Sequence, residues 1–289
     1  MTPGSLTRLI AHPERPLLVR GEIWITSRML SAAGFTEGPE GVIGLASSLG
    51  ADLCFVHVSE STTSSDLMEI RKIARAAGLD CAFTIDGPFQ RLTLSGSLFP
   101  VLEEMQRNPW RFESRIAEEM EVIREILNTN ASGMSELAVI GEDLGYTGGL
   151  YFSAETFRKL LLPFYRDLLK RFASSGICAG WHSDGAVTPL LSDLVECGFR
   201  FFSLEEEAVD ILRFKKEHGS RVTLIGGLRT EWLISKDLDP DGKIKRIESI
   251  KALSREGGLV LSSSCGLYDP AFIPVLKEIY RSIDGNLLC

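Results

Sequence analysis

Eight short apolar runs, separated by helical patterns, constrain the fold of this 289-residue chain more than any other feature. Most of the runs lack polar alternation, which is typical of parallel strands buried on both faces. Between them, apolar residues recur every three or four positions, most clearly over 157–172. Such alternation predicts a parallel α/β fold. The expected strands are 17–22, 53–58, 81–86, 136–143, 177–184, 201–205, 222–227 and 259–265.

Eight strand and helix repeats predict a (β/α)8 TIM-type barrel. The interval 86–136 is too long for one crossover and contains two helical patterns divided at Asn108-Pro109, so we expect a helical insertion after the third strand. No low-complexity tract or Pro/Gly-rich linker interrupts the chain, which predicts one barrel domain over 1–289. A doubly wound open sheet is the alternative, but 20–23 is not the Gly-rich phosphate turn that normally follows its first strand.

The composition is that of an ordinary globular protein, with 44% hydrophobic and 24% charged residues. A net charge of -8 argues against nucleic-acid or anionic-membrane partners, which require a concentrated positive surface. The six cysteines are dispersed, and no signal-like start or membrane-length apolar run is present. We therefore expect a cytoplasmic protein that acts on a small-molecule substrate.

Chemically active side chains stand where predicted strands end. His182 and Asp184 end the fifth strand, and Cys265 ends the eighth. Strand carboxyl ends converge on one mouth of a barrel, so these side chains can meet there as zinc ligands. Glu142 or Asp143, at the end of the fourth strand, could supply another oxygen. Neighbouring strand residues point to opposite faces, and of the two we favour Glu142.

His57 and Asp86 each end a strand and could form a proton-transfer pair. We take them, with Glu142, as candidate catalytic residues. Taken singly, His182 could be a strand-end histidine bonded to a backbone carbonyl, and Cys265 a small core residue. Their coincidence with Asp184 at strand ends favours a functional role. The candidate substrate-binding residues are Arg20, Glu22, Glu205 and Tyr268.

A series of short motifs follows from about Ile140 onward. They are Glu142-Asp143-Leu144-Gly145, Ser153-Ala154-Glu155, Leu162-Pro163-Phe164-Tyr165, His182-Ser183-Asp184-Gly185, Leu224-Ile225-Gly226-Gly227 and Ser264-Cys265-Gly266. Each motif alone is weak, but their order and spacing are fairly specific. In these motifs the chain resembles the uroporphyrinogen decarboxylase superfamily, which includes corrinoid-dependent methyltransferases. The barrel fold of this superfamily agrees with the eight strands.

The resemblance is closer to the methyltransferases than to the true decarboxylases. Decarboxylases have an Arg-Gln-Ala-Gly-Arg motif near the N-terminus, and only Arg20 matches it here. Their catalytic aspartate after the second strand is replaced by His57. The many carboxylates predicted at the mouth would also repel the acidic arms of a tetrapyrrole.

Methyltransferases of this superfamily bind zinc through a His-x-Cys pair and a later cysteine. The chain matches these positions at His182 and Cys265 but has Asp184 in place of the middle cysteine, which makes the metal a harder Lewis acid. The resemblance implies a zinc-dependent methyltransferase that moves a methyl group between a thiol or methyl ether and a corrinoid. We expect a separate partner protein to carry the corrinoid. The alternatives are a tetrapyrrole decarboxylase and a non-catalytic ligand-binding barrel.

Overall fold

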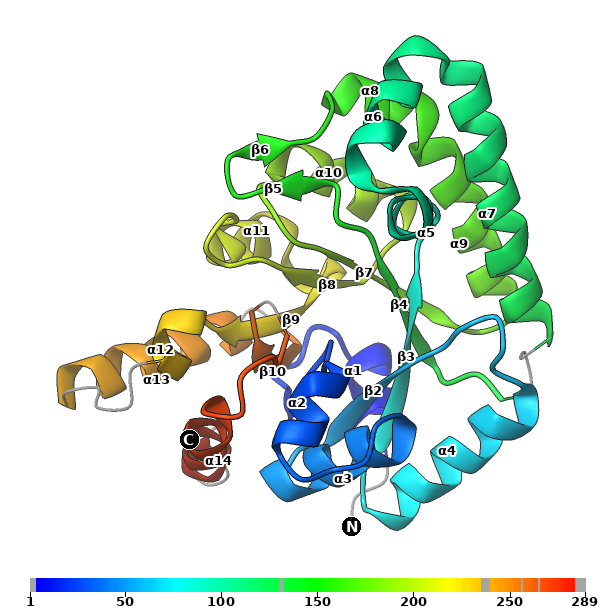
Figure 1. Ribbon diagram of the computed structural model, residues 1–289. Helices are drawn as coiled ribbons and strands as arrows, with labels where there is room; N and C mark the ends of the chain where they lie inside the picture. Colours follow the sequence, from blue (N-terminus) through cyan, green and yellow to red (C-terminus); the bar gives the residue numbers. More distant parts are fainter. Residues whose placement is uncertain (1–3, 130–132, 235–239, 256, 265, 284–289) are drawn as a thin grey trace. The chain divides into compact units, whose positions relative to one another are not determined.

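The computed structural model describes residues 4–129, 133–234, 240–255, 257–264 and 266–283, in which strands and helices alternate (Figure 1). The strands are β1 (Leu18–Arg20), β2 (Leu53–His57), β3 (Asp80–Asp86), β4 (Leu137–Gly141), β5 (Gly145–Tyr146), β6 (Gly149–Leu150), β7 (Cys178–Ser183), β8 (Phe201–Leu204), β9 (Thr223–Leu228) and β10 (Leu259–Ser263). The helices are α1 (Ser5–Ala11), α2 (Ser27–Ala32), α3 (Pro39–Leu49), α4 (Ser64–Ala76), α5 (Pro88–Gly96), α6 (Leu98–Arg107), α7 (Pro109–Thr129), α8 (Ala154–Leu160), α9 (Leu162–Ser174), α10 (Thr188–Cys197), α11 (Ile211–His218), α12 (Thr230–Ile234), α13 (Pro240–Arg255) and α14 (Phe272–Ile283), with a 3₁₀ turn, η1 (Gly219–Arg221).

Eight strands form one sheet in the order β1-β10-β9-β8-β7-β4-β3-β2. Apart from the small β5–β6 hairpin, each strand from β2 onward neighbours the next one in the chain, and β1 pairs in parallel with β10. The Asp52 amide also donates to the Arg20 carbonyl at 2.8 Å, which joins the end of β1 to the start of β2. This ring order confirms the predicted barrel and rejects the doubly wound sheet.

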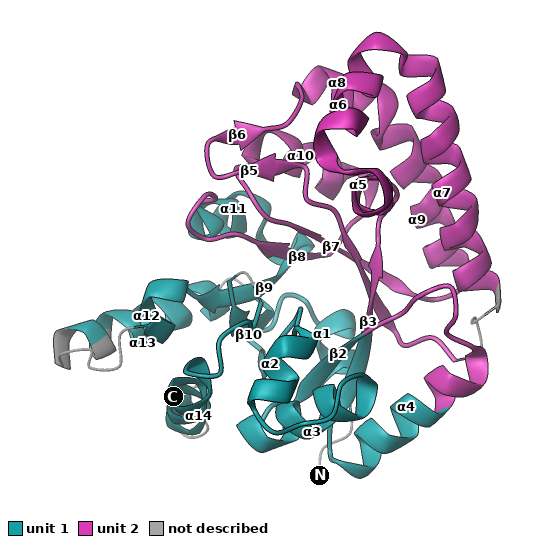
Figure 2. Cartoon of the chain, viewed as in Figure 1, with its two compact units in different colours: residues 1–56, 69–82, 210–289 teal, residues 57–68, 83–209 magenta. Residues whose placement is uncertain are grey.

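The chain divides into two compact units (Figure 2). Unit 1 contains residues 1–56, 69–82 and 210–289, and unit 2 contains 57–68 and 83–209. That 1–289 is a single domain stays a prediction. Within the described ranges, no helix has the length and apolar character needed to cross a membrane.

The predicted insertion after the third strand is confirmed. Helices α5, α6 and α7 lie between β3 and β4 and pack against one another in unit 2. The helical pattern over 157–172 is divided next to Pro163: α8 ends at Leu160, and α9 starts at Leu162 with the proline in its first turn. A proline is tolerated there because the first helical amides have no partner within the helix. Pro109 and Pro163 thus each mark the start of a helix.

Strand register places the candidate site residues of unit 2. Asp86 pairs with Gly141, Gly141 with His182, and His182 with Ser203, across β3, β4, β7 and β8. Register partners on neighbouring parallel strands present their side chains to the same side of the sheet. These four residues therefore form one row at the carboxyl ends of the strands, which we call the register row.

Candidate metal centre

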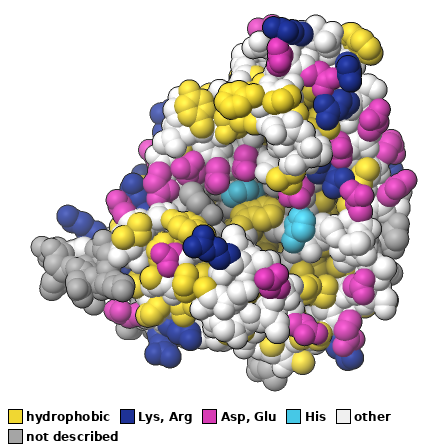
Figure 3. Space-filling view, in the orientation of Figure 1, with side chains coloured by type: hydrophobic (Ala, Val, Ile, Leu, Met, Phe, Trp, Pro, Cys, Tyr) yellow, Lys and Arg dark blue, Asp and Glu magenta, His cyan; other side chains and the backbone are white. Residues whose placement is uncertain are grey.

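Asp143, His182 and Asp184 bring three metal-ligating groups together in unit 2. One ligand atom from each side chain lies within 4.8 Å of the other two. The Nε2 atom of His182 is 3.8 Å from Asp184 Oδ1 and 3.9 Å from Asp143 Oδ1. Acidic side chains gather beside a histidine on the face shown in Figure 3. We call these three residues the metal cluster.

His182 is held in the form that a metal requires. Its ring is buried, and Nδ1 lies 3.0 Å from the Ser203 hydroxyl. Burial lowers the pKa of His182 to about 4, although the Asp143 carboxylate and Ser203 oppose the shift. The imidazole is thus neutral near pH 7. With Nδ1 at Ser203, Nε2 is left facing the two aspartates, which is the usual arrangement of a metal-binding histidine.

Two carboxylates hold the loop that carries Asp184. The Asp184 amide donates to Asp143 Oδ1 at 3.1 Å, and the Gly185 amide donates to Glu205 Oε2 at 2.6 Å. Gly185 has a φ of +86°, and a Cβ there would lie 2.3 Å from the Gly145 carbonyl carbon. Only glycine fits this left-handed, crowded position. Glu205, a predicted substrate-binding residue, therefore lies beside the metal cluster.

Tyr151 is a site residue that the sequence did not indicate. Burial raises the pKa of its phenol, and the nearby carboxylates of Asp143, Asp184 and Glu205 raise it further. The ring stacks on Tyr146, with centroids 5.9 Å apart. Both tyrosines belong to the β5–β6 hairpin region, whose position depends on contacts with the loop after β7, so no local pattern could have found them.

Glu142 is directed to another part of unit 2. Its Oε1 accepts hydrogen bonds from the Tyr165 hydroxyl at 2.7 Å and the Phe89 amide at 3.2 Å, and Oε2 accepts one from the Gln90 amide at 2.7 Å. Burial raises the pKa of Glu142 to about 8 against these donors. The carboxyl group thus caps the N-terminus of α5. Asp143, its neighbour, lies with His182 in the metal cluster.

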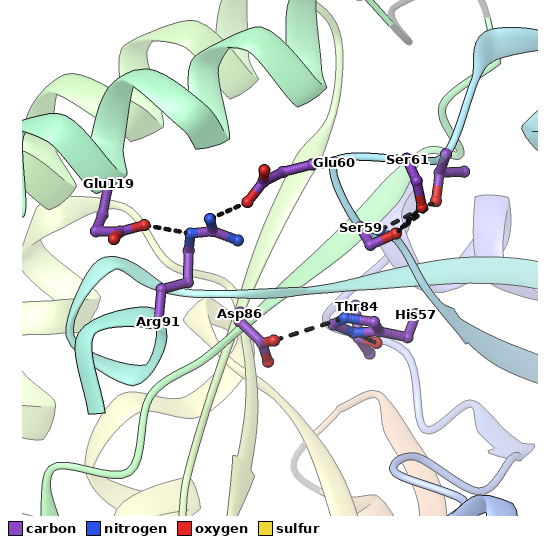
Figure 4. Close-up of polar contacts among 9 residues, drawn as sticks. His57, Ser59, Glu60, Ser61, Thr84, Asp86, Arg91 and Glu119 are labelled. Carbon is purple, nitrogen blue, oxygen red and sulfur yellow. Dashed lines mark hydrogen bonds and ion pairs between the residues drawn. The ribbon is translucent and has the colours of Figure 1, made fainter. Parts of the chain in front are cut away.

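His57 and Asp86, the predicted proton-transfer pair, lie close together (Figure 4), and that they transfer a proton stays a prediction. His57 Nε2 lies 3.6 Å from Asp86 Oδ2, and the Thr84 hydroxyl is 3.4 Å from His57 Nδ1. The side chains of His57 and Asp86 are 46% and 25% exposed, so both are accessible. Arg91 is engaged separately: it forms ion pairs with Glu60 and Glu119.

Glu22, a predicted substrate-binding residue, lies in a buried network of unit 1. Tyr280 donates to its Oε1 at 2.6 Å, and the Ser263 amide and hydroxyl donate to Oε2 at 3.0 and 2.5 Å. Burial raises the pKa of Glu22 in spite of these donors. Glu22 is only 1% exposed, and these donors reach both of its carboxylate oxygens; that Glu22 binds substrate stays a prediction.

The remaining predicted residues also belong to unit 1. The Arg20 guanidinium forms a two-pronged ion pair with Asp52, at 2.9 and 2.8 Å. Tyr268 is half-exposed and packs edge-to-face against Phe272. Cys265 lies outside the described residues. The structure therefore brings together His182, Asp184 and Glu205, and separately His57 and Asp86, from the predicted set.

We predict that Gly185→Ala destabilises the protein and weakens metal binding, because a Cβ would displace either the loop or the Gly145 backbone. The matched control is Gly176→Ala, which has a φ of +69° but open space around its Cβ position. The control carries only the backbone penalty of about 1 kcal/mol. Urea unfolding should show a further loss of roughly 1–3 kcal/mol in Gly185→Ala. Equal losses in the two variants would contradict the crowding argument.

The buried His182 should also make the metal-free protein sensitive to acid. Its folded pKa of about 4 lies below the unfolded value of about 6.5. Between these values only the unfolded state binds the proton, so stability is complete above about pH 6.5 and falls as pH drops toward 4, by up to about 3 kcal/mol.

The measurement is the unfolding free energy against pH, in chelator, for the wild type and His182→Gln. The raised pKa of Glu142, about 8, acts with the opposite sign as pH rises, but it is common to both proteins and cancels in their difference. The wild type should lose more stability on acidification than the variant. Parallel pH profiles would show that His182 does not carry this effect.

Comparisons with known proteins agree with this fold. The family model for uroporphyrinogen decarboxylase (URO-D) matches residues 95–277. Two curated relatives, both named methylcobamide:CoM methyltransferase MtaA and both from Methanosarcina barkeri, are 32% identical over 134 residues and 31% identical over 135. Each match covers 46% of this chain but only 37% of the relative, so the chain matches little more than a third of the length of these proteins.

Solved structures with the same fold include a methyltransferase from Methanosarcina mazei, with a TM-score of 0.65 and 16% identity over 92% of this chain and 94% of that one. A D-allulose 3-epimerase from Methylomonas sp. has a TM-score of 0.57 and 14% identity, covering 94% of this chain and 98% of its own. One fold thus serves different reactions, and the likeness shows the fold alone. Because the family model spans more than half of its residues, the chain belongs to the uroporphyrinogen decarboxylase (URO-D) family.

Proposed function

We propose that this protein is a zinc-dependent methyltransferase that moves a methyl group between a small thiol or methyl ether and a corrinoid carried by a partner protein. The observation that carries the proposal is the metal cluster, Asp143, His182 and Asp184, at the strand ends of unit 2. The curated relatives support the reaction class, since their name specifies methyl transfer between methylcobamide and CoM. We place the protein in the cytoplasm, without nucleic-acid or membrane partners.

The metal cluster fits a zinc ion. With zinc bonds of about 2.1 Å, the ligands of a tetrahedral site are roughly 3.4 Å apart. The observed separations from His182 Nε2, 3.8 and 3.9 Å, therefore need only a small contraction. Bound zinc would act as a Lewis acid that stabilises negative charge on the sulfur or oxygen exchanging the methyl group. That Cys265 or Glu142 also binds the metal stays a prediction.

The chain's own residues have distinct tasks in this scheme. Ser203 holds the His182 ring so that Nε2 faces the aspartates. His57 moves the proton: it accepts the S–H proton of a thiol acceptor, or supplies a proton to the alkoxide that a methyl ether leaves behind. Asp86, 3.6 Å from His57 Nε2, balances the charge of the imidazolium.

Metal content tests the site directly. We expect about one equivalent of zinc in protein purified without chelator, and a loss of affinity of roughly a hundredfold or more in His182→Ala and Asp143→Asn. Cys265→Ala should also lose affinity if Cys265 is a ligand. Glu196→Gln, which changes an exposed carboxylate on α10, is the control and should bind zinc normally.

The same proteins are assayed for thiol-dependent demethylation of free methylcobalamin and for thermal stability. The ligand variants should lose activity while their melting temperatures stay close to that of the wild type, because the barrel core lies elsewhere. Unchanged zinc content in both His182→Ala and Asp143→Asn would rule out the metal cluster. Unfolded variants would show that the residues are structural.

A further inference from the structure

The register row has no side chain at its second position, Gly141. Gly141 of β4 pairs with Asp86 on one side and with His182 on the other. Neighbouring strands lie about 4.8 Å apart, so the Cα atoms of Asp86 and His182 are separated by about 10 Å. Two groups with different chemistry therefore stand on either side of a glycine.

One side of this arrangement is the metal cluster, and the other is the His57–Asp86 pair. The 3.6 Å between His57 Nε2 and Asp86 Oδ2 is an ion-pair distance and exceeds the usual hydrogen-bond range of about 2.7–3.2 Å. An oxygen atom placed beside both can accept a hydrogen bond from Nε2–H. If that oxygen carries a hydrogen, it can also donate to the Asp86 carboxylate. A hydroxyl group satisfies both conditions.

The charges around His57 favour a neutral hydroxyl over the anionic groups that a histidine could also bind. A carboxylate, sulfonate or phosphate near His57 would meet Asp86 at short range. It would also be repelled by the carboxylates of Asp143, Asp184 and Glu205 in the same unit. A neutral hydroxyl avoids both costs, because it uses the Asp86 carboxylate as an acceptor.

Of the two substrate classes proposed above, thiols and methyl ethers, the metal cluster favours methyl ethers. Its donors among the described residues are one imidazole nitrogen and two carboxylate oxygens, which form a harder set than thiolates. A harder metal site favours an oxygen ligand over sulfur. The methylated atom is then an ether oxygen.

We propose that the substrate is a small methyl ether that also carries a free hydroxyl group. The ether oxygen lies at the metal cluster, and the hydroxyl lies beside both His57 Nε2 and Asp86 Oδ2, across Gly141. This inference rests on the proposed function for the methyl transfer. For this substrate His57 holds the free hydroxyl, and the alkoxide formed at the metal cluster takes its proton from water; the hydroxyl site itself depends only on residues of the chain.

The test is calorimetric binding of matched probes to the full chain, both loaded with zinc and metal-free. The probes are 2-, 3- and 4-methoxyphenol, whose isomers vary the distance between the two oxygens, methoxybenzene, which lacks the hydroxyl, and 4-methoxybenzoate, which is an anion. At least one methoxyphenol should bind roughly tenfold more tightly than methoxybenzene, the typical worth of a hydrogen bond to a charged group. The preference should persist without zinc, and the benzoate should bind least.

His57→Gln and Asp86→Asn should each remove the preference for the hydroxyl probes while leaving zinc content unchanged. The control is His12→Gln, since His12 is also about half exposed but lies in unit 1, beside Glu14. Equal binding of methoxybenzene and all three methoxyphenols to the wild type, or tighter binding of the benzoate, would overturn the inference. So would a preference that survives in both variants.

Failure of the proposed function gives a different result. A protein that binds no zinc but still prefers a methoxyphenol through His57 and Asp86 would overturn the metal-dependent mechanism and retain the hydroxyl site. A protein that binds zinc at the metal cluster but shows no hydroxyl preference would overturn this inference alone.

Discussion

The parallel register of β3, β4, β7 and β8 is the constraint on which the candidate site depends. It sets Asp86, Gly141, His182 and Ser203 in one row, with the loops that carry Asp143 and Asp184 just beyond the strand ends. A slip of one residue in β7 would turn His182 to the other face of the sheet and break its contact with Ser203. The apolar core that sets the strand register therefore also sets the positions of His182 and Ser203.

The metal cluster is electrostatically costly without a cation. Asp143 and Asp184 converge on a histidine that burial keeps neutral, and Glu205 adds a third carboxylate through the Gly185 amide. Backbone donors offset part of the repulsion, but they hold the carboxylates in place rather than neutralise them. A bound divalent cation would relieve this repulsion, which is a physical reason for the site to take up a metal as well as a chemical one.

Much of the fold and of the candidate site could be predicted, because the site residues lie at the ends of strands that the sequence indicates. The eight strands, the insertion after the third, and the closeness of His57 to Asp86 and of His182 to Asp184 all come from local patterns combined with parallel topology. That Asp143, rather than Glu142, lies with His182 could not be predicted in this way, since the placement of Glu142 depends on the N-terminus of α5 and on a tyrosine 23 residues away. Local sequence carries no signal for such contacts.

Burial divides the acidic residues at the strand ends into two groups. Glu22 and Glu142 are fully buried, and each is satisfied by a helix tyrosine and by backbone amides, so they act within the architecture. Asp143 and Asp184 are 38% and 44% exposed and remain available to a ligand. A count of acidic residues from the sequence therefore overstates the charge that a substrate meets. In unit 2 the accessible carboxylates, with Asp86 and Glu205, would still repel the acidic arms of a tetrapyrrole.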